Sequence, residues 1–200
     1  MPLPSTVEEL ATWIELEYRR KPGSMVFAAM FADGNSATGG SDWNFGAVIS
    51  LEDCDPEHLF AEIGMTISFR RRETILQRRA GYGALAVSVL LRYCFNLPSD
   101  SPPGLGLRRV GVHSLPNNAA THKLAKRLGF RLEGKQRWCR VVDVANGKVG
   151  NGQTLRKGDV SGSPGIDAHY FSMCWDEWEG HGRDVVQHIL ACGLRCGAKL

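Results

Sequence analysis

The chain has 200 residues, of which 43% are hydrophobic and 22% are charged, and its formal net charge is +3. A chain of this length can bury most of its apolar surface, so its core requires neither disulfides nor a metal. The mild positive charge permits an anionic ligand but does not by itself indicate a nucleic-acid partner. We therefore expect one globular domain over residues 1–200.

Four further features concern the cellular setting and a possible metal. No run of about 18 apolar residues occurs, so we expect no membrane partner, and the first 20 residues lack the order of a signal peptide. The six cysteines are scattered, which is typical of reduced thiols. Cys192 and Cys196, with His181 and His188 upstream, fit the spacing of a zinc site poorly. These features predict a cytoplasmic protein without a metal.

The first third of the chain predicts one helix followed by three strands. Ser5–Tyr18 is predicted to form a helix, and Ser5 or Thr6 can cap its N-terminus. Two apolar runs rich in Val and Phe, Met25–Phe31 and Phe45–Leu51, flank a polar, Gly-rich stretch and predict a β-hairpin. His58–Phe69 is predicted to be a third and longer strand.

The middle of the chain predicts a β-α-β unit. Apolar residues recur at helical spacing over Ala84–Phe95, and a strand is predicted over Leu107–Leu115. The strands on either side of this helix should run parallel. Another helix follows, with Asn117 or Asn118 as its N-cap and Gly129 at its end.

The last third predicts two strands, over residues 130–144 and His169–Trp175, and then a C-terminal helix. A polar, Gly-rich insertion at about residues 145–165 separates the two strands. The whole order predicts an α/β (α+β) fold with a mixed, mostly antiparallel sheet, one central parallel β-α-β crossover and flanking helices. A doubly wound nucleotide-binding fold would instead repeat the β-α-β unit several times.

The segment RRAGYGALA, residues 78–86, joins a predicted strand to a predicted helix. Its glycines allow the backbone to approach a ligand, helix-start amides attract phosphate, and arginines add charge-assisted hydrogen bonds. Ala86 stands where a dinucleotide fingerprint needs a third glycine, and no Gly-Lys-Ser/Thr follows, so neither nucleotide motif is present. Taken alone, the segment is equally typical of a structural turn.

Several motifs together resemble those of the GNAT superfamily of acyl-CoA-dependent N-acyltransferases, most closely its RimJ/RimL-like branch. The resemblance covers roughly Phe45 to Glu179 and implies a GNAT-like fold. The matching motifs are Arg78-x-x-Gly81-x-Gly83, Asn118 with Thr121, Leu128-Gly129-Phe130, Glu133-Gly134, Ala61–Gly64 and the WDEWEG of residues 175–180.

The resemblance implies acetyl-CoA as a co-substrate whose pyrophosphate is wrapped by the glycine loop. It further implies that the pantetheine arm pairs with the strand ending near Phe69, and that a backbone amide near Ile67 polarises the thioester carbonyl. The cofactor-binding residues expected from it are Ile67, Phe69, Arg78, Arg79, Ala80, Gly81, Tyr82, Gly83, Ala84 and Asn118.

An acceptor amine must lose a proton before it attacks, because a lysine-type amine has a pKa of about 10.4. A carboxylate is the usual base, and Glu62 is the best candidate; its alternative role is a strand-face carboxylate paired with an arginine. Asn118 and Thr121 could hydrogen-bond the pantetheine or the sulfur, although Asn118 can also simply cap its helix. His113 is expected to be a satisfied histidine near a strand end rather than a catalytic one.

Two departures from the family pattern bear on activity. Much of the superfamily uses a tyrosine on the helix after the second central strand, where this chain has Leu124 and Leu128; Tyr170 is a remote substitute. Family members usually begin with a strand and helix before the equivalent of Thr6–Tyr18, so part of the acceptor-side wall is expected to be shortened. The Gly-rich insertion could replace some of it as a flap.

The sequence therefore predicts an acetyl-CoA-dependent N-acetyltransferase that acts on a primary amine by direct attack in a ternary complex. The acceptor is a protein N-terminus or a small amine, and the chain is a monomer or homodimer. The alternative is a catalytically inactive acyl-CoA-binding or scaffold protein that keeps the fold. A third reading, a nucleic-acid binder using the arginine clusters, would require steeply salt-dependent binding, and we expect none of useful affinity.

Overall fold

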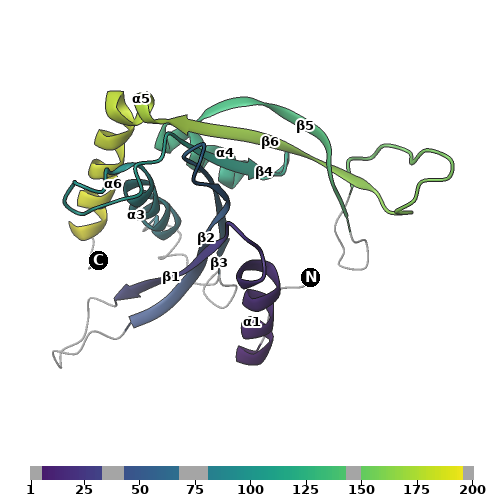
Figure 1. Cartoon of the computed structure of the whole chain (residues 1–200), viewed down its shortest axis with the longest axis horizontal. Coiled ribbons are helices and arrows are strands. Elements are labelled where there is room, and N and C mark those ends of the chain that lie inside the picture. The colour runs from purple at the N-terminus through teal and green to yellow at the C-terminus, as the bar shows by residue number, and fades with distance from the viewer. Residues whose placement is uncertain (1–5, 33–42, 68–80, 143–149, 196–200) are drawn as a thin grey trace.

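The computed structural model describes residues 6–32, 43–67, 81–142 and 150–195 (Figure 1). Six strands form one sheet in the order β1-β2-β3-β4-β6-β5, in which β3 and β4 are parallel and the other neighbours antiparallel. This confirms the predicted fold class. The strands are β1 (Met25–Ala32), β2 (Trp43–Asp55), β3 (Phe60–Ile67), β4 (Arg109–Ser114), β5 (Arg131–Val141) and β6 (Gly165–Cys174).

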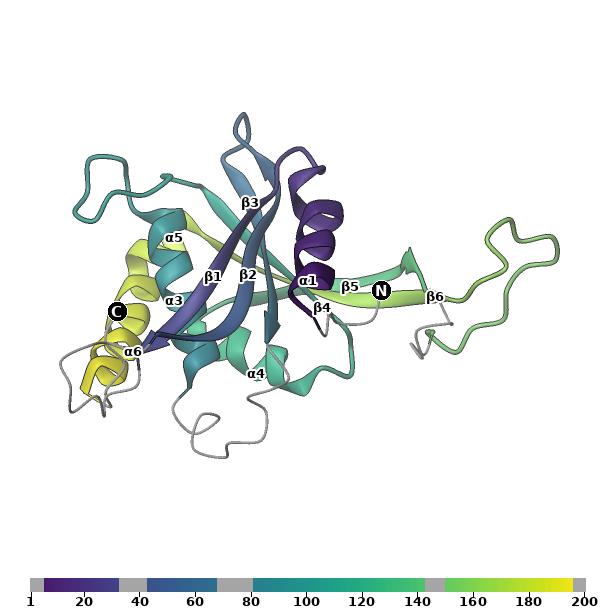
Figure 2. The ribbon, with the colours of Figure 1, turned by 90° about the horizontal axis from the view of Figure 1, so that it is seen from below.

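Helices cover both faces of the sheet. Figures 1 and 2 show α3 and α6 on one side of strands β1–β3 and α1 on the other. The helices of the described chain are α1 (Val7–Ile14), α3 (Tyr82–Phe95), α4 (Ala119–Leu128), α5 (Trp175–Glu177) and α6 (Arg183–Arg195). Helix α1 continues as a π-helical turn over Glu15–Arg19, and another π-helical turn over Trp178–Gly182 joins α5 to α6.

The helix ends follow the predicted capping residues. The Thr6 hydroxyl accepts from the Glu9 amide at 3.1 Å while the Glu9 carboxylate accepts from the Thr6 amide, which is a capping box. Asn118 accepts from the Thr121 amide at the start of α4, and Gly129 ends that helix in the left-handed conformation. These local signals confirm the predicted N-cap of α1 and both predicted ends of α4, whereas α1 ends at Ile14 and continues to Arg19 as a π-helical turn.

Two predicted strands have wrong boundaries. The last strand was expected over His169–Trp175, but β6 begins at Gly165 and Trp175 already belongs to α5. His58 was expected in the third strand, but β3 begins at Phe60 and His58 lies in the turn after β2. The cause is Asp55, whose carboxylate accepts from the backbone amides of Glu57 and His58 and stabilises the turn. The side chain of His58 also pairs with Asp55, at 2.9 Å.

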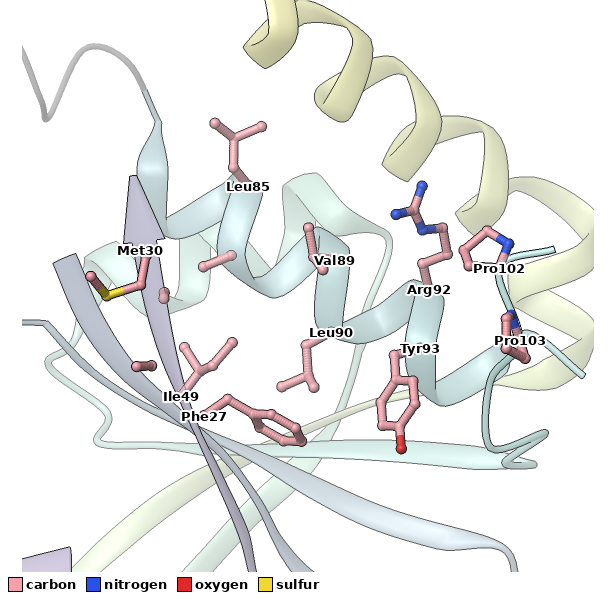
Figure 3. Close-up of a pocket in the computed structure, with 13 residues that line it drawn as sticks. Phe27, Met30, Ile49, Leu85, Val89, Leu90, Arg92, Tyr93, Pro102 and Pro103 are labelled. Carbon is pink, nitrogen blue, oxygen red and sulfur yellow. The ribbon is translucent and has the colours of Figure 1, made fainter. Parts of the chain in front are cut away.

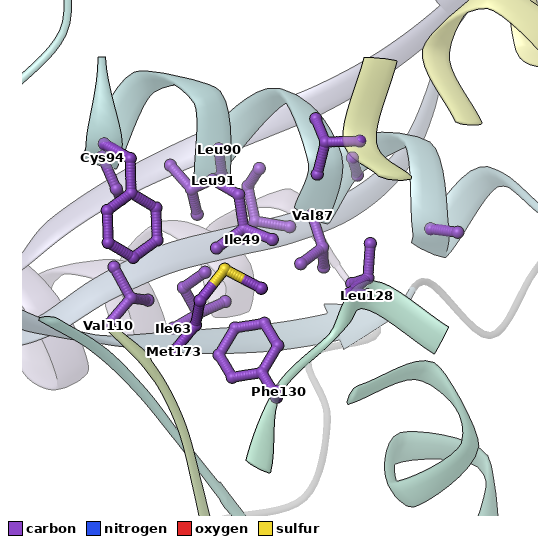
Figure 4. Close-up of a cluster of buried hydrophobic side chains, with 14 of the residues drawn as sticks. Ile49, Ile63, Val87, Leu90, Leu91, Cys94, Val110, Leu128, Phe130 and Met173 are labelled. Carbon is purple, nitrogen blue, oxygen red and sulfur yellow. The ribbon is translucent and has the colours of Figure 1, made fainter. Parts of the chain in front are cut away.

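The hydrophobic core lies between α3 and one face of the sheet (Figure 4). Leu91 and Cys94 of α3 are fully buried, as are Val110 of β4 and Met173 of β6. Helix α6 covers α3 so closely that a Cβ at Gly193 would collide with the side chain of Leu85. Because this face is filled with apolar side chains, the charged side chains of β3 and β4, Glu62 and Arg109, lie on the opposite face.

Strands β5 and β6 extend well beyond the body of the molecule as a long hairpin (Figure 2). Residues 150–164, within the predicted insertion, contain neither helix nor strand, and residues 143–149 lie outside the described chain. Asp167 holds this segment through the side chain of Asn151, the amide of Trp138 and an ion pair with Lys135 at 2.8 Å. These bonds hold the pKa of Asp167 well below its usual range, with that from Asn151 contributing most.

In the described ranges, no helix combines the length and apolar composition needed to cross a membrane.

Candidate active site

The two parallel strands separate soon after they meet. They pair only at Phe60 with Arg109, Ala61 with Val110, and Glu62 with Gly111, although β3 continues to Ile67 and β4 to Ser114. Within the residues that the structure describes, β3 beyond Glu62 pairs with β2 alone. A row of backbone groups on one edge of β3 is thereby left for another partner.

A cavity of about 240 Å³ fills the opening between the separated strands. Most of its lining is apolar, and α3 and α4 contribute alongside the strands. Its side chains that can donate or accept hydrogen bonds come from His113, Ser114, Asn118 and Thr121. A cleft that is lined mainly by apolar residues and carries a few polar groups suits an organic ligand.

A carboxylate–imidazole pair stands where the strands part. Oε2 of Glu62 lies 2.6 Å from Nδ1 of His113, and Nε2 of His113 lies 2.7 Å from Oε1 of Gln136. The side chains of Glu62 and His113 are 13% and 25% exposed. Both ring nitrogens of His113 therefore have hydrogen-bond partners, as the sequence led us to expect. One of these partners is Glu62, the residue predicted to act as the base. The predicted alternative, an arginine pairing with Glu62, does not occur in the described chain.

Tyr170 packs beside this pair on the same face of the sheet. Its ring centroid lies 4.5 Å from that of His113, which is the residue opposite it on β4. A Cβ at Gly111 would collide with the Tyr170 hydroxyl, so the glycine makes room for it. Burial raises the pKa of Tyr170, which keeps the phenol protonated and able to donate.

An ion pair joins β4 to β5 next to this cluster. Nη1 of Arg109 lies 2.8 Å from Oε1 of Glu133, and the Ser172 hydroxyl donates to the same oxygen at 2.6 Å. Arg109 first, and Ser172 second, lower the pKa of Glu133 to about 2. Arg109 also lies 5.5 Å from the ring centroid of Tyr170. The charge of Arg109 is thus committed to holding three strands together.

The N-terminus of α3 presents a possible anion site. Gly81 caps the helix at φ +70°, in the left-handed region, and within the described residues no side chain caps this end. A Cβ at Gly81 would lie 4.0 Å from Nη1 of Arg127, so α4 brings a cation to the first turn of α3. Backbone amides and a nearby guanidinium are the groups that bind phosphate.

The structure describes part of the predicted cofactor site. Gly81 and the first turn of α3, Tyr82–Ala84, lie at this helix end, and Ile67 ends β3. Asn118 and Thr121 both line the cleft, where Asn118 also caps α4 as the alternative role predicted. The other predicted residues, Phe69, Arg78, Arg79 and Ala80, lie outside the described chain.

Two other cavities lie elsewhere. One of about 420 Å³ separates β1 from α3 and is lined by apolar side chains such as Phe27, Leu90 and Tyr93, with Arg92 at its margin (Figure 3). The other, of about 560 Å³, lies beside the Lys135–Asp167 pair. Neither is lined by His113, which lines the cleft between β3 and β4 and pairs with Glu62, so this cleft is the candidate active site.

Sequence reasoning missed two features of the site, the contacts of His113 and the position of Arg127. The contacts of His113 with Glu62 and Gln136 join residues on three strands and depend on sheet register, which no local pattern reveals. Arg127 lies two positions before Gly129 in a helix recognised from the sequence, but its proximity to α3 depends on packing.

In the described ranges, no group of three or more His, Cys, Asp and Glu side chains could hold a metal ion.

Comparisons with known proteins give the family. The model of the acetyltransferase (GNAT) domain matches residues 1–131, while no protein with a curated description matches the sequence.

Solved structures share the fold at low sequence identity. A GCN5-related N-acetyltransferase from Brucella melitensis aligns with a TM-score of 0.60 and 23% identity, over 93% of this chain and 66% of that one. A spermidine N-acetyltransferase, SpeG, from Vibrio cholerae aligns with a TM-score of 0.55 and 15% identity, over 90% of this chain and 81% of that one. With the family match over more than half of its length, this chain belongs to the GNAT acetyltransferases.

Proposed function

We propose that this protein transfers an acetyl group from acetyl-CoA to a primary amine in the cleft between β3 and β4. The observation that carries the proposal is the separation of the strands directly beyond Glu62 and Gly111. That separation opens a cleft with both apolar and polar lining residues, and His113, which lines it, pairs with the carboxylate of Glu62. An N-acetyltransferase of the RimJ/RimL-like branch is the finer assignment that the sequence motifs favour.

The residues present fit acetyl-CoA, which the family implies as co-substrate. The edge of β3 beyond Glu62 offers backbone groups to the pantetheine amides, as a strand does to an added chain. We assign the pyrophosphate to Gly81 and the first turn of α3, with Arg127 as the described cation. A backbone amide near Ile67 is our candidate to polarise the thioester carbonyl.

The acceptor amine arrives protonated and must lose one proton. In the proposed reaction Glu62 accepts that proton, and the neutral amine attacks the thioester carbonyl carbon in a ternary complex. A C–N bond forms and the C–S bond breaks. The nitrogen loses a second proton as the amide forms, and the CoA thiolate takes up one, so one proton is released overall. Asn118 and Thr121, which line the cleft, are our candidates for hydrogen bonds to the pantetheine or the sulfur.

Tyr170 is the proposed donor to the leaving thiolate. Helix α4 carries no tyrosine, whereas Tyr170 supplies a protonated hydroxyl over Gly111, the partner of Glu62 in the parallel register. Its raised pKa, caused mainly by burial, keeps the proton available.

The acceptor is a protein N-terminus or a small-molecule amine. The structural similarity to a spermidine N-acetyltransferase makes a polyamine the first small amine to test. Glu52 lies opposite Glu62 on the same face, so two carboxylates on adjacent strands are available to a cationic acceptor.

CoA release in the presence of an amine panel tests the proposal. The panel contains spermidine, a lysine-type amine and a peptide with a free N-terminus, and thiol release is compared with and without each amine. Glu62→Gln should lower kcat by about 10²- to 10⁴-fold while acetyl-CoA still binds. Turnover that is unchanged in Glu62→Gln would remove Glu62 from the reaction.

The absence of a tyrosine from α4 also supports a second candidate function, a catalytically inactive acyl-CoA-binding protein. Such a protein would bind acetyl-CoA but release no CoA with any amine in the panel. Amine-dependent CoA release, together with acetylated amine detected by mass spectrometry, would exclude it.

A further inference from the structure

His113 has a hydrogen-bond partner on each ring nitrogen, and the two partners differ in chemistry. An ionised carboxylate can only accept, so Nδ1 carries the proton that it shares with Glu62. The amide of Gln136 can accept through its oxygen or donate through its nitrogen, so it can satisfy Nε2 with or without a proton. The ring can therefore gain or lose its Nε2 proton without losing its bond to Glu62.

The same geometry leaves one oxygen of Glu62 uncommitted. His113 holds Oε2, and no residue in the described chain makes a hydrogen bond to Oε1. His113 lines the cleft itself, and its side chain shares a face of the sheet with Glu62 and Tyr170. One bond thus fixes the carboxylate, while its second oxygen can receive a proton.

Few charged groups compete for Glu62. The groups around His113 are Glu62 on β3, the protonated Tyr170 on β6 and the uncharged Gln136 on β5. Arg109, four residues earlier on β4, is paired with Glu133. On β2, Glu52 is the residue opposite Glu62, and its Oε1 accepts from the Ser50 hydroxyl at 2.8 Å. Since no lysine or arginine in the described ranges pairs with Glu62, a proton on His113 supplies the positive charge that contacts this carboxylate directly.

We propose that His113 is a positioning residue for Glu62 and sets the strength of that carboxylate as a base. With a proton on Nε2 the ring is positive, stabilises the carboxylate and makes it a weaker base. When Nε2 loses its proton, the bond from Nδ1 remains while the neighbouring charge disappears, so the carboxylate becomes a stronger base. This inference rests on the proposed acetyl transfer.

Two substitutions at His113 separate positioning from titration. His113→Ala removes the bond to Glu62 and should lower kcat by about tenfold or more, with little change in the KM for acetyl-CoA. The side-chain amide introduced by His113→Asn can donate from nearly the position of Nδ1 but cannot titrate. This variant should recover part of kcat and lose the rise of kcat with pH that the wild type shows.

A substitution at Gln136, which faces Nε2 of His113, should shift the pH dependence of kcat upward. In Gln136→Glu a carboxylate faces Nε2, accepts a hydrogen bond from the protonated Nε2 and stabilises the positive ring. The rise of kcat with pH should therefore move upward by about one pH unit, equivalent to a tenfold change in the protonation equilibrium. The matched control is His58→Asn, because His58 also pairs with a carboxylate through Nδ1, at Asp55 in an exposed turn. Its pH profile should equal that of the wild type.

The outcomes distinguish this inference from the proposed function. Turnover by the wild type, with unchanged pH profiles in both His113→Asn and Gln136→Glu, would overturn the role of His113 alone. A wild type without turnover would contradict the proposed function. The titration of the His113 ring, followed by NMR, does not depend on turnover: its midpoint should move to lower pH in Glu62→Gln and to higher pH in Gln136→Glu. The absence of both shifts would refute the coupling itself.

Discussion

Arg127 places a positive charge beside the first turn of α3, where sequence analysis had expected only the arginines of the preceding loop. If this turn holds the cofactor phosphates, Arg127→Ala should raise the KM for acetyl-CoA by about tenfold, because it removes a charge-assisted contact, and should leave kcat nearly unchanged. Steady-state kinetics with varied acetyl-CoA measures both parameters.

Lys123→Ala is the control for Arg127→Ala, since it removes an exposed cation from the same helix. An equal rise in KM in both variants would indicate a general effect of charge and would contradict a specific contact with Arg127.

The Arg109–Glu133 pair makes part of the stability of the protein depend on pH. The pKa of Glu133 is lowered to about 2, chiefly by Arg109, so the stabilisation is complete above the ordinary glutamate value of 4.5. It is lost as the pH falls from about 4.5 to 2. Glu133→Gln should cost less than about 1 kcal/mol at pH 6, because the pair is partly exposed, and almost nothing near pH 2.

Urea denaturation of wild type and Glu133→Gln at several pH values measures this difference. A stability gap between the two proteins that stays constant from pH 6 to pH 2 would contradict the assigned role of Glu133.

At the scale of elements, α4 shows how one residue can serve both a helix and a site. Asn118 caps α4 through its bond from the Thr121 amide and also lines the cleft. Asn118→Ala should destabilise the protein by about 0.5–2 kcal/mol because the cap is lost, whereas Asn118→Ser keeps a capping oxygen and most of the stability. If the amide also binds the pantetheine or the sulfur, both variants should lose activity.

Thermal denaturation together with CoA release separates these two roles of Asn118. Full activity in Asn118→Ser would restrict the residue to capping and would remove it from our set of site residues.

The elements themselves were largely predictable. The capping residues of α1 and α4, the apolar runs of β1 and β2, and the single parallel crossover are encoded in local sequence. The prediction that His58 lies in a strand was wrong, because the hydrogen bonds accepted by Asp55 stabilise a turn there. The competition between a turn and a strand is decided by side-chain geometry, which periodicity does not report.

At the scale of the whole molecule, the site depends on where the sheet divides. Strands β1–β3 and β4–β6–β5 are joined by only three paired positions between β3 and β4, with the core beneath α3 shared by both parts. Glu62 could be chosen from the sequence because it lies in the strand that leads to the expected cofactor site. Its partners could not, because Glu62 and His113 are 51 positions apart and meet only through the register of the parallel strands.

The central claim is that acetyl-CoA binds with its pyrophosphate at the start of α3, and calorimetry tests it most directly. Acetyl-CoA is titrated into wild type, Gly81→Asp and Gly81→Asn, since both Asp and Asn tolerate the left-handed conformation at this position. We predict that the wild type binds, that Gly81→Asn binds nearly as well, and that the carboxylate of Gly81→Asp weakens binding by about tenfold or more, or about 1.4 kcal/mol. A wild type that does not bind acetyl-CoA would contradict the account, and equal binding by all three proteins would contradict the placement of the pyrophosphate.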